Sequence, residues 1–312
     1  MTPDPAFLYL TPQHREALAG LTYAILAQKG FLVLTGDAGT GKTTLLARVL
    51  QRLPTTRIRT SVILNPTLTA SEFLEMTLLD FGITEVPVSK AQRLTKLQQL
   101  LTQADRQSQI SALIIDEAHK LRPDVLEEIR LLGNFEQSDH KLLQIVFLGQ
   151  NELGDLLNRP DLRQLKQRIA ARFNLRPLAA SEVEQYIQYR WTKAGGDPKL
   201  PFTAQSIESI AAYSRGIPRV INAICDNALL QAFAEETAVV APHHVLEACT
   251  ALDLLVEPQP LQSVGNPEPE PEPEQNPDPV YQAELPSLNR YTDTAVRQSF
   301  FSKWAGKLGL AN

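Results

Sequence analysis

The sequence contains few cysteines and no long apolar run. Cys225 and Cys249 are the only two among 312 residues, so nothing indicates a disulfide-rich class, and buried thiols in a reducing compartment are expected. Their spacing suits no metal site. Residues 1–5 include no basic segment followed by an apolar core, and no run approaches the ~18 to 20 apolar residues that span a bilayer. We therefore expect a cytoplasmic protein.

A strong net charge is also absent from most of the chain. The formal net charge is −5, but eight acids and four bases in 257–312 account for −4 of it and leave the first 256 residues near −1. A nearly neutral body has no global field that attracts nucleic acid, although local basic clusters can still do so. The apolar content of 43% is normal for a globular protein, and the length allows two domains or one domain with appendages.

The most informative stretch lies between an apolar run, 31–34, and a helix-like segment. Its glycines let the chain turn tightly with N–H groups aimed inward, and the next helix offers the positive end of its dipole to the same anion. We predict a phosphate-binding loop in which Lys42 reaches the β- and γ-phosphates of a nucleotide and the Thr43 hydroxyl binds Mg²⁺. The alternative, a glycine-rich turn without a ligand, would bury a lysine ammonium without an anion. The predicted cofactor-binding residues are Gly36, Asp37, Ala38, Gly39, Thr40, Gly41, Lys42, Thr43 and Thr44.

A second apolar segment, 111–115, ends in the adjacent carboxylates Asp116 and Glu117. A continuous apolar run is typical of a buried parallel strand, and parallel strands place their carboxyl ends at one edge of a sheet. Asp116 is therefore predicted to hold Mg²⁺, through water, beside the phosphate loop. Glu117 is predicted to orient and polarise the attacking water, which favours hydrolysis over transfer to another substrate. The alternative for Glu117 is an acid that a helix dipole stabilises.

Strand-like and helix-like segments alternate over residues 1–178. This alternation implies parallel pairing through right-handed crossovers, with the ligand at the carboxyl ends of the strands. We predict a three-layer α/β domain with an N-terminal helix. The expected strands are 31–35, 58–64, 111–116, 142–148 and 172–176, and the expected helices are 12–28, 42–53, 71–81, 90–104, 123–136 and parts of 152–171.

Strand patterns stop near residue 179. Ser181 to Glu184 has the form of a capping box, and Gly195 to Pro198 is a strong helix stop. We predict a small all-helical lid domain over 179–256. Its expected helices are 181–194, 203–213, 217–235 and 243–256.

Composition changes sharply after Val256. Alternating Pro and Glu at 267–274 can neither pair in a sheet nor bury area, so 257–285 is predicted to be a disordered, extended linker. The segment 286–312 has the pattern of a short amphipathic helix with aromatic and basic residues. It either docks back on its own body or anchors a partner protein or an anionic membrane surface. Membrane contact would place the protein peripherally at the inner membrane.

Strand, phosphate loop, Asp-Glu pair and helical lid together resemble the AAA+ ATPase family over roughly residues 7–256. Four longer stretches are similar to the ExeA/GspA group, the general secretion pathway protein A ATPases and their MshM relatives. These stretches are Tyr9–Leu18, Leu148–Leu153, Leu162–Ile169 and Gly216–Asn222. Members of that group usually continue into a membrane span and a peptidoglycan-binding module. This sequence continues into the acidic linker and short tail, so we expect both modules to be absent.

The resemblance implies roles for further polar residues. Gln150, with Asn151 as its rival, matches the polar sensor of the γ-phosphate, just past the strand expected between the phosphate loop and Asp116. Arg219 matches the second sensor, a lid arginine that touches the same nucleotide, and a plain surface arginine is the alternative. Arg168 and Arg172 are candidates for the finger that reaches the γ-phosphate of a neighbouring subunit. An arginine fork meets phosphate oxygens bidentately, and simple solvation is the alternative for each.

Two weaker expectations concern residues near the site. Asn65, which ends the second strand, is expected to hold Glu117 away from water until a partner binds. Tyr9 either contacts the adenine or packs as a core tyrosine. His119 stands after Asp-Glu-Ala as in helicase motif II, but such a helicase needs two RecA-like halves and this chain has room for one.

These features predict an ATP-hydrolysing AAA+ protein with ATP and Mg²⁺ as cofactors. Its cycle is expected to be coupled to self-assembly, with a ring as the expected oligomer, and to a cell-envelope secretion, pilus or exopolysaccharide machine whose protein partner binds 286–312. One alternative is a transposition regulator of the TniB/TnsC kind, which would bind DNA, the less favoured partner. The other alternative is a slow ATP-dependent switch. The basic cluster available for DNA comprises Arg159, Arg163, Lys166 and Arg168.

Overall fold

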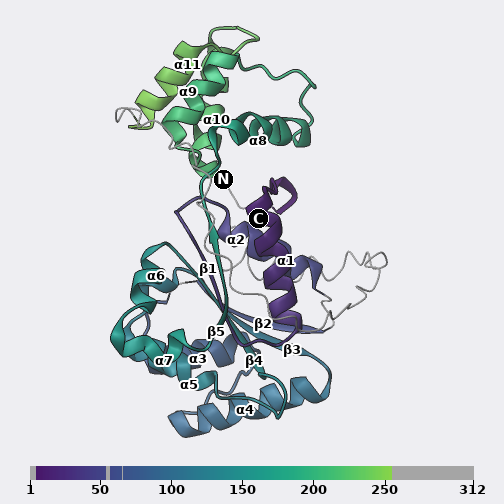
Figure 1. Ribbon diagram of the computed structural model, residues 1–312, viewed down its shortest axis with the longest axis vertical. Helices are drawn as coiled ribbons and strands as arrows, with labels where there is room; N and C mark the ends of the chain where they lie inside the picture. Colours follow the sequence, from purple (N-terminus) through teal and green to yellow (C-terminus); the bar gives the residue numbers. More distant parts are fainter. Residues whose placement is uncertain (1–4, 54–56, 65, 255–312) are drawn as a thin grey trace, which may run out of the picture. The chain divides into compact units, whose positions relative to one another are not determined.

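A computed structural model of the chain describes residues 5–53, 57–64 and 66–254 (Figure 1). Asn65, the predicted linker 257–285 and the predicted tail 286–312 lie outside the described residues. The chain divides into two units, Met1–Gln259 and Pro260–Asn312, and only the first contains described residues. Within the described ranges, no helix combines the length and the apolar character that crossing a bilayer requires.

Five parallel strands form one sheet in the order β2-β3-β4-β1-β5. Because β4 lies between β3 and β1, the carboxyl ends of these three strands are neighbours. The chain leaves β1 toward β2 on one side and leaves β4 toward β5 on the other, so the gap between β1 and β4 is the switch point at which α/β sheets bind ligands. The strands are β1 (Phe31–Gly36), β2 (Ile58–Ile63), β3 (Ile110–Ile115), β4 (Leu143–Gly149) and β5 (Ile169–Leu175).

The central strands are mostly apolar because helices cover both faces of the sheet. In β1, Phe31 and Val33 join the large core on one face, and alternation along the strand sends Leu32 and Leu34 to the other. All four side chains are at most 2% exposed. The predicted three-layer α/β fold is confirmed, and the physical reason is this double burial.

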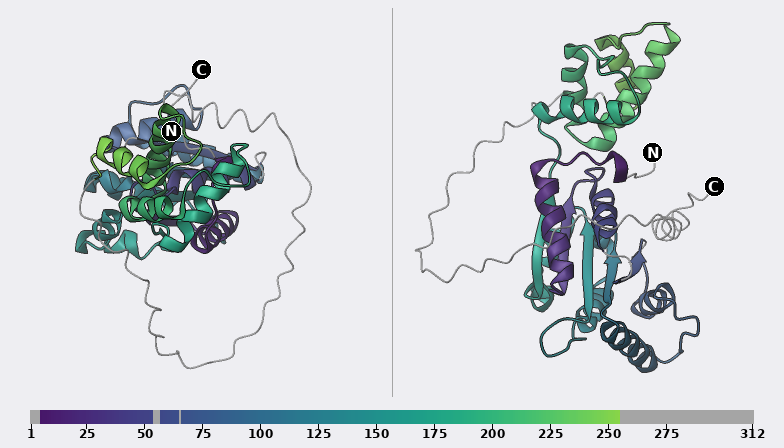
Figure 2. Two further views of the ribbon diagram at one scale, coloured as in Figure 1. Left: turned by 90° about the horizontal axis from the view of Figure 1, so that it is seen from above. Right: turned by 90° about the vertical axis from the view of Figure 1, so that its right-hand side faces the viewer.

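Helices from different parts of the chain make the two outer layers. On one face, α1 contacts β5 and α2 contacts β1; Figure 2 shows α1 running alongside the strands. On the other face, α3 contacts β2 and α4 contacts β3, and α5 contacts α3 and α7. The helices are α1 (Pro12–Leu26), α2 (Lys42–Arg52), α3 (Ala70–Asp80), α4 (Lys90–Arg106), α5 (Pro123–Leu132), α6 (Glu152–Leu157) and α7 (Arg163–Lys166), with short 3₁₀ turns η1 (Pro5–Phe7), η2 (Ala118–Lys120) and η3 (Pro160–Leu162).

Four further helices follow the sheet and pack on one another. Contacts join α10 to α9 and α11, α11 to α9, and α8 to α9. Buried apolar side chains such as Ile210, Ile221 and Val245 form their shared core. The four are α8 (Ala180–Lys193), α9 (Ala204–Ser214), α10 (Pro218–Ala234) and α11 (Pro242–Ala251).

Three expectations about local structure were wrong. Strand β5 begins at Ile169 and not at 172, because it is an edge strand whose side chains alternate in burial and resemble a short helix by composition. Helix α5 ends at Leu132 and not at 136, since Glu136 pairs with Lys141 in an antiparallel bridge. Helix α8 begins after Ala179, whose N–H donates to the Glu182 carboxylate at 2.9 Å, so the cap lies two residues before Ser181.

The turn after α9 requires a glycine. Gly216 has φ +71°, and a Cβ there would overlap the carbonyl oxygen of Leu178, whose own N–H donates to the Gly216 carbonyl at 2.8 Å. We predict that Gly216→Ala lowers the free energy of unfolding by about 2 kcal/mol, through the left-handed backbone and the steric overlap. Urea unfolding measures it. Gly154→Ala is the control, because Gly154 lies in α6 and nothing is within 4 Å of the new methyl group. This variant should raise the free energy of unfolding by about 1 kcal/mol at most. Equal losses in both variants would contradict this account.

Candidate nucleotide-binding site

The loop between β1 and α2 has the backbone that an anion-binding turn requires. Gly39 and Gly41 have φ of +86° and +97°, which side chains with a Cβ rarely adopt. The loop is also fixed internally, because the Thr40 hydroxyl and N–H both donate to the Asp37 carbonyl, at 2.8 and 3.3 Å. Helix α2 then begins at Lys42 with no side-chain cap, so its first N–H groups face the loop.

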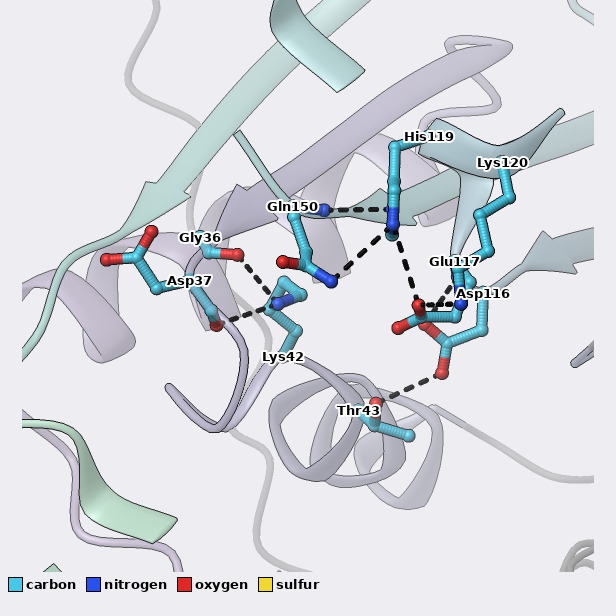
Figure 3. A network of polar contacts seen from close by, with 9 residues as sticks. All are labelled: Gly36, Asp37, Lys42, Thr43, Asp116, Glu117, His119, Lys120 and Gln150. Atoms are coloured by element: carbon cyan, nitrogen blue, oxygen red, sulfur yellow. Dashed lines mark hydrogen bonds and ion pairs between the residues drawn. The ribbon is translucent and has the colours of Figure 1, made fainter. Parts of the chain in front are cut away.

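Lys42 points into this loop and is buried. Its side-chain nitrogen donates to the Gly36 carbonyl at 2.7 Å and to the Asp37 carbonyl at 2.9 Å, and the residue is 7% exposed (Figure 3). Burial lowers the pKa of Lys42, and the nearby Asp116 and Glu117 carboxylates oppose that shift. A buried ammonium among helix N–H groups is an environment that favours a bound anion.

Thr43 and Asp116 meet beside the lysine. The Thr43 hydroxyl donates to Asp116 Oδ2 at 3.1 Å, and Asp116 Oδ1 accepts the Glu117 N–H at 2.9 Å. Loss of water around Asp116 raises its pKa, against the lowering effect of these two hydrogen bonds. A hydroxyl and a carboxylate are the oxygen ligands that Mg²⁺ prefers, so these residues fit the predicted metal.

Glu117 adopts an unusual backbone conformation. Its φ of 53° and ψ of 35° lie in the left-handed region, and the 3₁₀ turn η2 follows at once. Non-glycine residues held there cluster at functional sites. The carboxylate is 36% exposed, and its Oε2 lies 2.9 Å from Lys120 Nζ and 3.6 Å from His119 Nε2.

The two candidates for the first sensor lie on different sides of the loop. Gln150 directly follows β4; its N–H donates to His119 Nδ1 at 3.3 Å, and its side-chain nitrogen is 3.5 Å from His119 Nε2. Asn151 instead donates its side-chain amide to Asp37 Oδ1 at 2.7 Å. In Figure 3 the Gln150 side chain lies between Lys42 and His119. Gln150 is therefore placed toward the predicted phosphate and the acidic pair, whereas Asn151 supports the loop.

Arg219 lies at the start of α10, against the phosphate loop. Its N–H donates to the Gly39 carbonyl at 3.3 Å, and a Cβ built on Gly39 would lie 2.8 Å from Arg219 Cβ. The side chain is exposed and makes no polar contact with other described residues. The structure thus brings the predicted second sensor beside the residues predicted to bind nucleotide.

Arg168 and Arg172 occupy different environments. Arg168 precedes β5, and its guanidinium donates to the Arg130 carbonyl at 3.0 Å and to Asn134 Oδ1 at 2.6 Å. Arg172 lies within β5, an edge strand, where it is exposed and without a polar partner among the described residues. Among the described residues, neither guanidinium makes a polar contact with the phosphate loop of its own chain.

Sequence reasoning missed three side chains at this site. His14 is 4% exposed behind the loop; its Nε2 lies 3.4 Å from the Thr40 carbonyl, and its Nδ1 lies 2.7 Å from the Thr11 hydroxyl. Burial lowers the pKa of His14, which keeps it neutral near pH 7. His119 and Lys120 contact Glu117, as described above. His14 lies in one of the four family stretches, whereas the contacts of Lys120 depend on the Glu117 backbone and have no sequence pattern.

Tyr9 packs against lid residues. Its ring meets Tyr186 edge-on, with centroids 6.0 Å apart, and lies 5.6 Å from the Tyr189 ring. Its hydroxyl donates to the Gln185 side-chain oxygen at 2.9 Å. Of the two expectations for Tyr9, packing among side chains is the one that these contacts support.

The fold and this site define a nucleoside triphosphatase domain of the phosphate-loop class. Comparison with known proteins is more specific: residues 25–157 match the model of the AAA domain. It is also 42% identical over 238 residues to general secretion pathway protein A of Aeromonas hydrophila, which confirms the predicted resemblance. That match covers 75% of this chain and 43% of the relative, so the chain spans less than half of the relative's length.

Solved structures with the same fold are more distant in sequence. Cdc6p from Pyrobaculum aerophilum superposes with a TM-score of 0.60 at 20% identity, over 80% of this chain and 71% of that one. The ORC2 protein of Aeropyrum pernix, solved in ADPNP-ADP complexes, has a TM-score of 0.57 at 15% identity, over 80% and 72%. At such identities the likeness establishes the fold alone.

The half-buried Asp116 carboxylate should lower stability at neutral pH. In the folded protein the pKa of Asp116 is raised above its unfolded value near 3.8. This group therefore favours the folded state most below the unfolded pKa, and that stabilisation is lost as pH rises through the folded pKa. We predict that Asp116→Asn raises the free energy of unfolding of the nucleotide-free protein at pH 7 by about 1 kcal/mol, since asparagine can keep both hydrogen bonds. Thermal unfolding at pH 7 measures the gain, which should shrink at pH 4. A loss of stability at pH 7 would count against it.

Proposed function

We propose that this chain binds ATP with Mg²⁺ between the α/β domain, 1–178, and the helical lid, 179–256, and hydrolyses the ATP. The single observation that carries this proposal is the meeting of Lys42, Thr43 and Asp116 at one sheet edge, with the Glu117 carboxylate next in the chain. The AAA domain match supports it. Ordinary glycine-rich turns need neither a buried lysine nor an adjacent acidic pair.

Each residue then has a role that follows from its position. Lys42 and the N–H groups of residues 36–44 bind the phosphates, and Thr43 with Asp116 holds Mg²⁺. The metal, when bound, neutralises charge on the phosphate oxygens. Glu117 orients the attacking water and accepts its proton on a carboxylate oxygen. Gln150 donates to the γ-phosphate as first sensor, and Arg219 reaches the same nucleotide from the lid.

A second subunit would complete the site. Arg172 is the better-placed finger, because its guanidinium is exposed on the edge strand, whereas that of Arg168 is already held by Arg130 and Asn134. An arginine supplied in trans makes turnover depend on assembly, as in an AAA+ ring. Arg168 would then position the start of β5.

The relative's name supports the wider role. General secretion pathway protein A is 42% identical over the matched residues, so we place the ATP cycle of this chain in the assembly or regulation of a cell-envelope secretion machine. The partner would bind 286–312, outside the described residues. Pilus or exopolysaccharide assembly fits the same chemistry.

The alternatives have less support. Of the basic cluster proposed for DNA, Arg159 pairs with Asp161 at 2.9 Å and Arg168 is held internally, which leaves Arg163 and Lys166 exposed on α7. A slow switch would use the same site without hydrolysis. A gel shift with duplex DNA at two salt concentrations tests the first alternative, and a phosphate-release assay tests the second.

We predict that Glu117→Gln keeps MgATP affinity and lowers kcat at least about 100-fold, because it removes the proton acceptor and preserves the shape of the site. Lys42→Ala should lose both binding and turnover. Binding is measured with a fluorescent ATP analogue and turnover by phosphate release. Glu127→Gln, on the exposed surface of α5, is the matched control and should behave like wild type. Wild-type turnover in Glu117→Gln would remove that residue from catalysis.

We predict that specific activity rises with protein concentration and that Arg172→Ala lowers kcat about 10³-fold without loss of ATP binding. Mixing Arg172→Ala with Glu117→Gln should restore part of the activity, since mixed neighbours can form intact sites. Arg106→Ala, an exposed arginine at the end of α4, serves as the control. No recovery on mixing, together with unchanged turnover in Arg172→Ala, would refute a finger at this position.

A further inference from the structure

Lys120 pairs with the Glu117 carboxylate, and the His119 imidazole lies close to the same group. Lys120 Nζ lies 2.9 Å and His119 Nε2 lies 3.6 Å from the same oxygen, Glu117 Oε2 (Figure 3). The Lys120 side chain is 52% exposed and that of His119 is 12% exposed. An oxygen engaged by an ammonium is a poor acceptor for a proton from water, so this arrangement differs from the one that hydrolysis needs.

The hydrogen bond that His119 accepts from Gln150 indicates which of its ring nitrogens carries no proton. The Gln150 N–H donates to Nδ1 at 3.3 Å, so Nδ1 accepts and the neutral imidazole carries its proton on Nε2. That Nε2–H faces the Glu117 carboxylate. The same Nε2–H group also faces the side-chain amide of Gln150, 3.5 Å away. If the amide is turned over, its oxygen lies at this position and can accept the hydrogen bond.

His119 therefore joins the predicted sensor to the predicted base. Gln150 follows β4 and lies between Lys42 and His119, whereas Glu117 follows β3. Glu117 has a left-handed backbone and begins a turn of three residues, so a small change in its backbone angles would redirect its carboxylate.

We propose that Lys120 and His119 hold Glu117 in a resting position, and that His119 transmits release from Gln150. The inference rests on the proposed ATPase function. When Gln150 turns its side-chain amide toward a γ-phosphate, the side-chain contact with His119 Nε2 is lost, while the backbone hydrogen bond to Nδ1 stays. His119 then moves, and Glu117 exchanges Lys120 for the attacking water. His119 and Lys120 are positioning residues, since they act through Glu117.

The first test is the split between turnover and binding in Lys120 variants. Lys120→Met should raise kcat about two- to fivefold, the range that one partly exposed ion pair supports, and leave MgATP affinity unchanged. Lys120→Arg keeps the charge and should restore the resting rate. Lys29→Met, an exposed lysine in the turn after α1, is the matched control. Unchanged or lower kcat in Lys120→Met, with MgATP affinity retained, would overturn the proposal.

The second test reads His119 directly, without turnover. Nitrogen NMR of the imidazoles, with the His119 signals assigned by His119→Asn, should show an unprotonated Nδ1 and a protonated Nε2 in the nucleotide-free protein. Adding a non-hydrolysable ATP analogue with Mg²⁺ should shift these signals in wild type and much less in Gln150→Ala at saturating analogue. An Nδ1–H tautomer, or equal shifts in both proteins, would overturn the link.

The two proposals fail in distinguishable ways. Absence of magnesium-dependent ATP binding in the wild-type protein would refute the proposed function. Normal binding and turnover, with Lys120→Met no faster than wild type, would refute only the resting position of Glu117.

Discussion

The site depends on keeping a buried ammonium and a half-buried carboxylate together at the carboxyl ends of parallel strands. Burial lowers the pKa of Lys42 and raises that of Asp116, so each charged form is disfavoured by loss of water. The strand order keeps them together, because β4 alone separates β1, which leads through the loop to Lys42, from β3, which ends just before Asp116. Apolar side chains on both faces of β1, β3 and β4 supply the rigid support. The fold tolerates this unfavourable burial, and a bound nucleotide with its metal would relieve it.

The phosphate loop is held from several directions besides its own backbone. His14 of α1 contacts the Thr40 carbonyl, Asn151 after β4 contacts Asp37, and the Arg219 N–H at the start of α10 contacts Gly39. These supports come from segments far apart in the sequence. A conformational change in the loop would therefore alter contacts with the first helix, with the residue after β4 and with the lid helices.

Sequence alone predicted the parts of this site that backbone geometry imposes. Left-handed turns need glycine at 39 and 41, and a doubly covered strand needs a continuous apolar run before Asp116, so both patterns are visible in the sequence. The start of β5 was not predictable, because a half-exposed edge strand lacks that run. The environments of Arg168 and Arg172 depend on contacts with α5 and on strand order. The contact between Lys120 and Glu117 depends on a left-handed glutamate, which no residue pattern specifies.

The place of His14 affects how small a working piece of this protein can be. The AAA domain match begins at residue 25, yet the imidazole that touches the Thr40 carbonyl belongs to α1, and the Thr11 hydroxyl that orients it caps the same helix. An excised fragment that started at the first strand would keep every glycine of the loop and lose the buttress behind it. A fragment that keeps this support has to begin at or before Thr11.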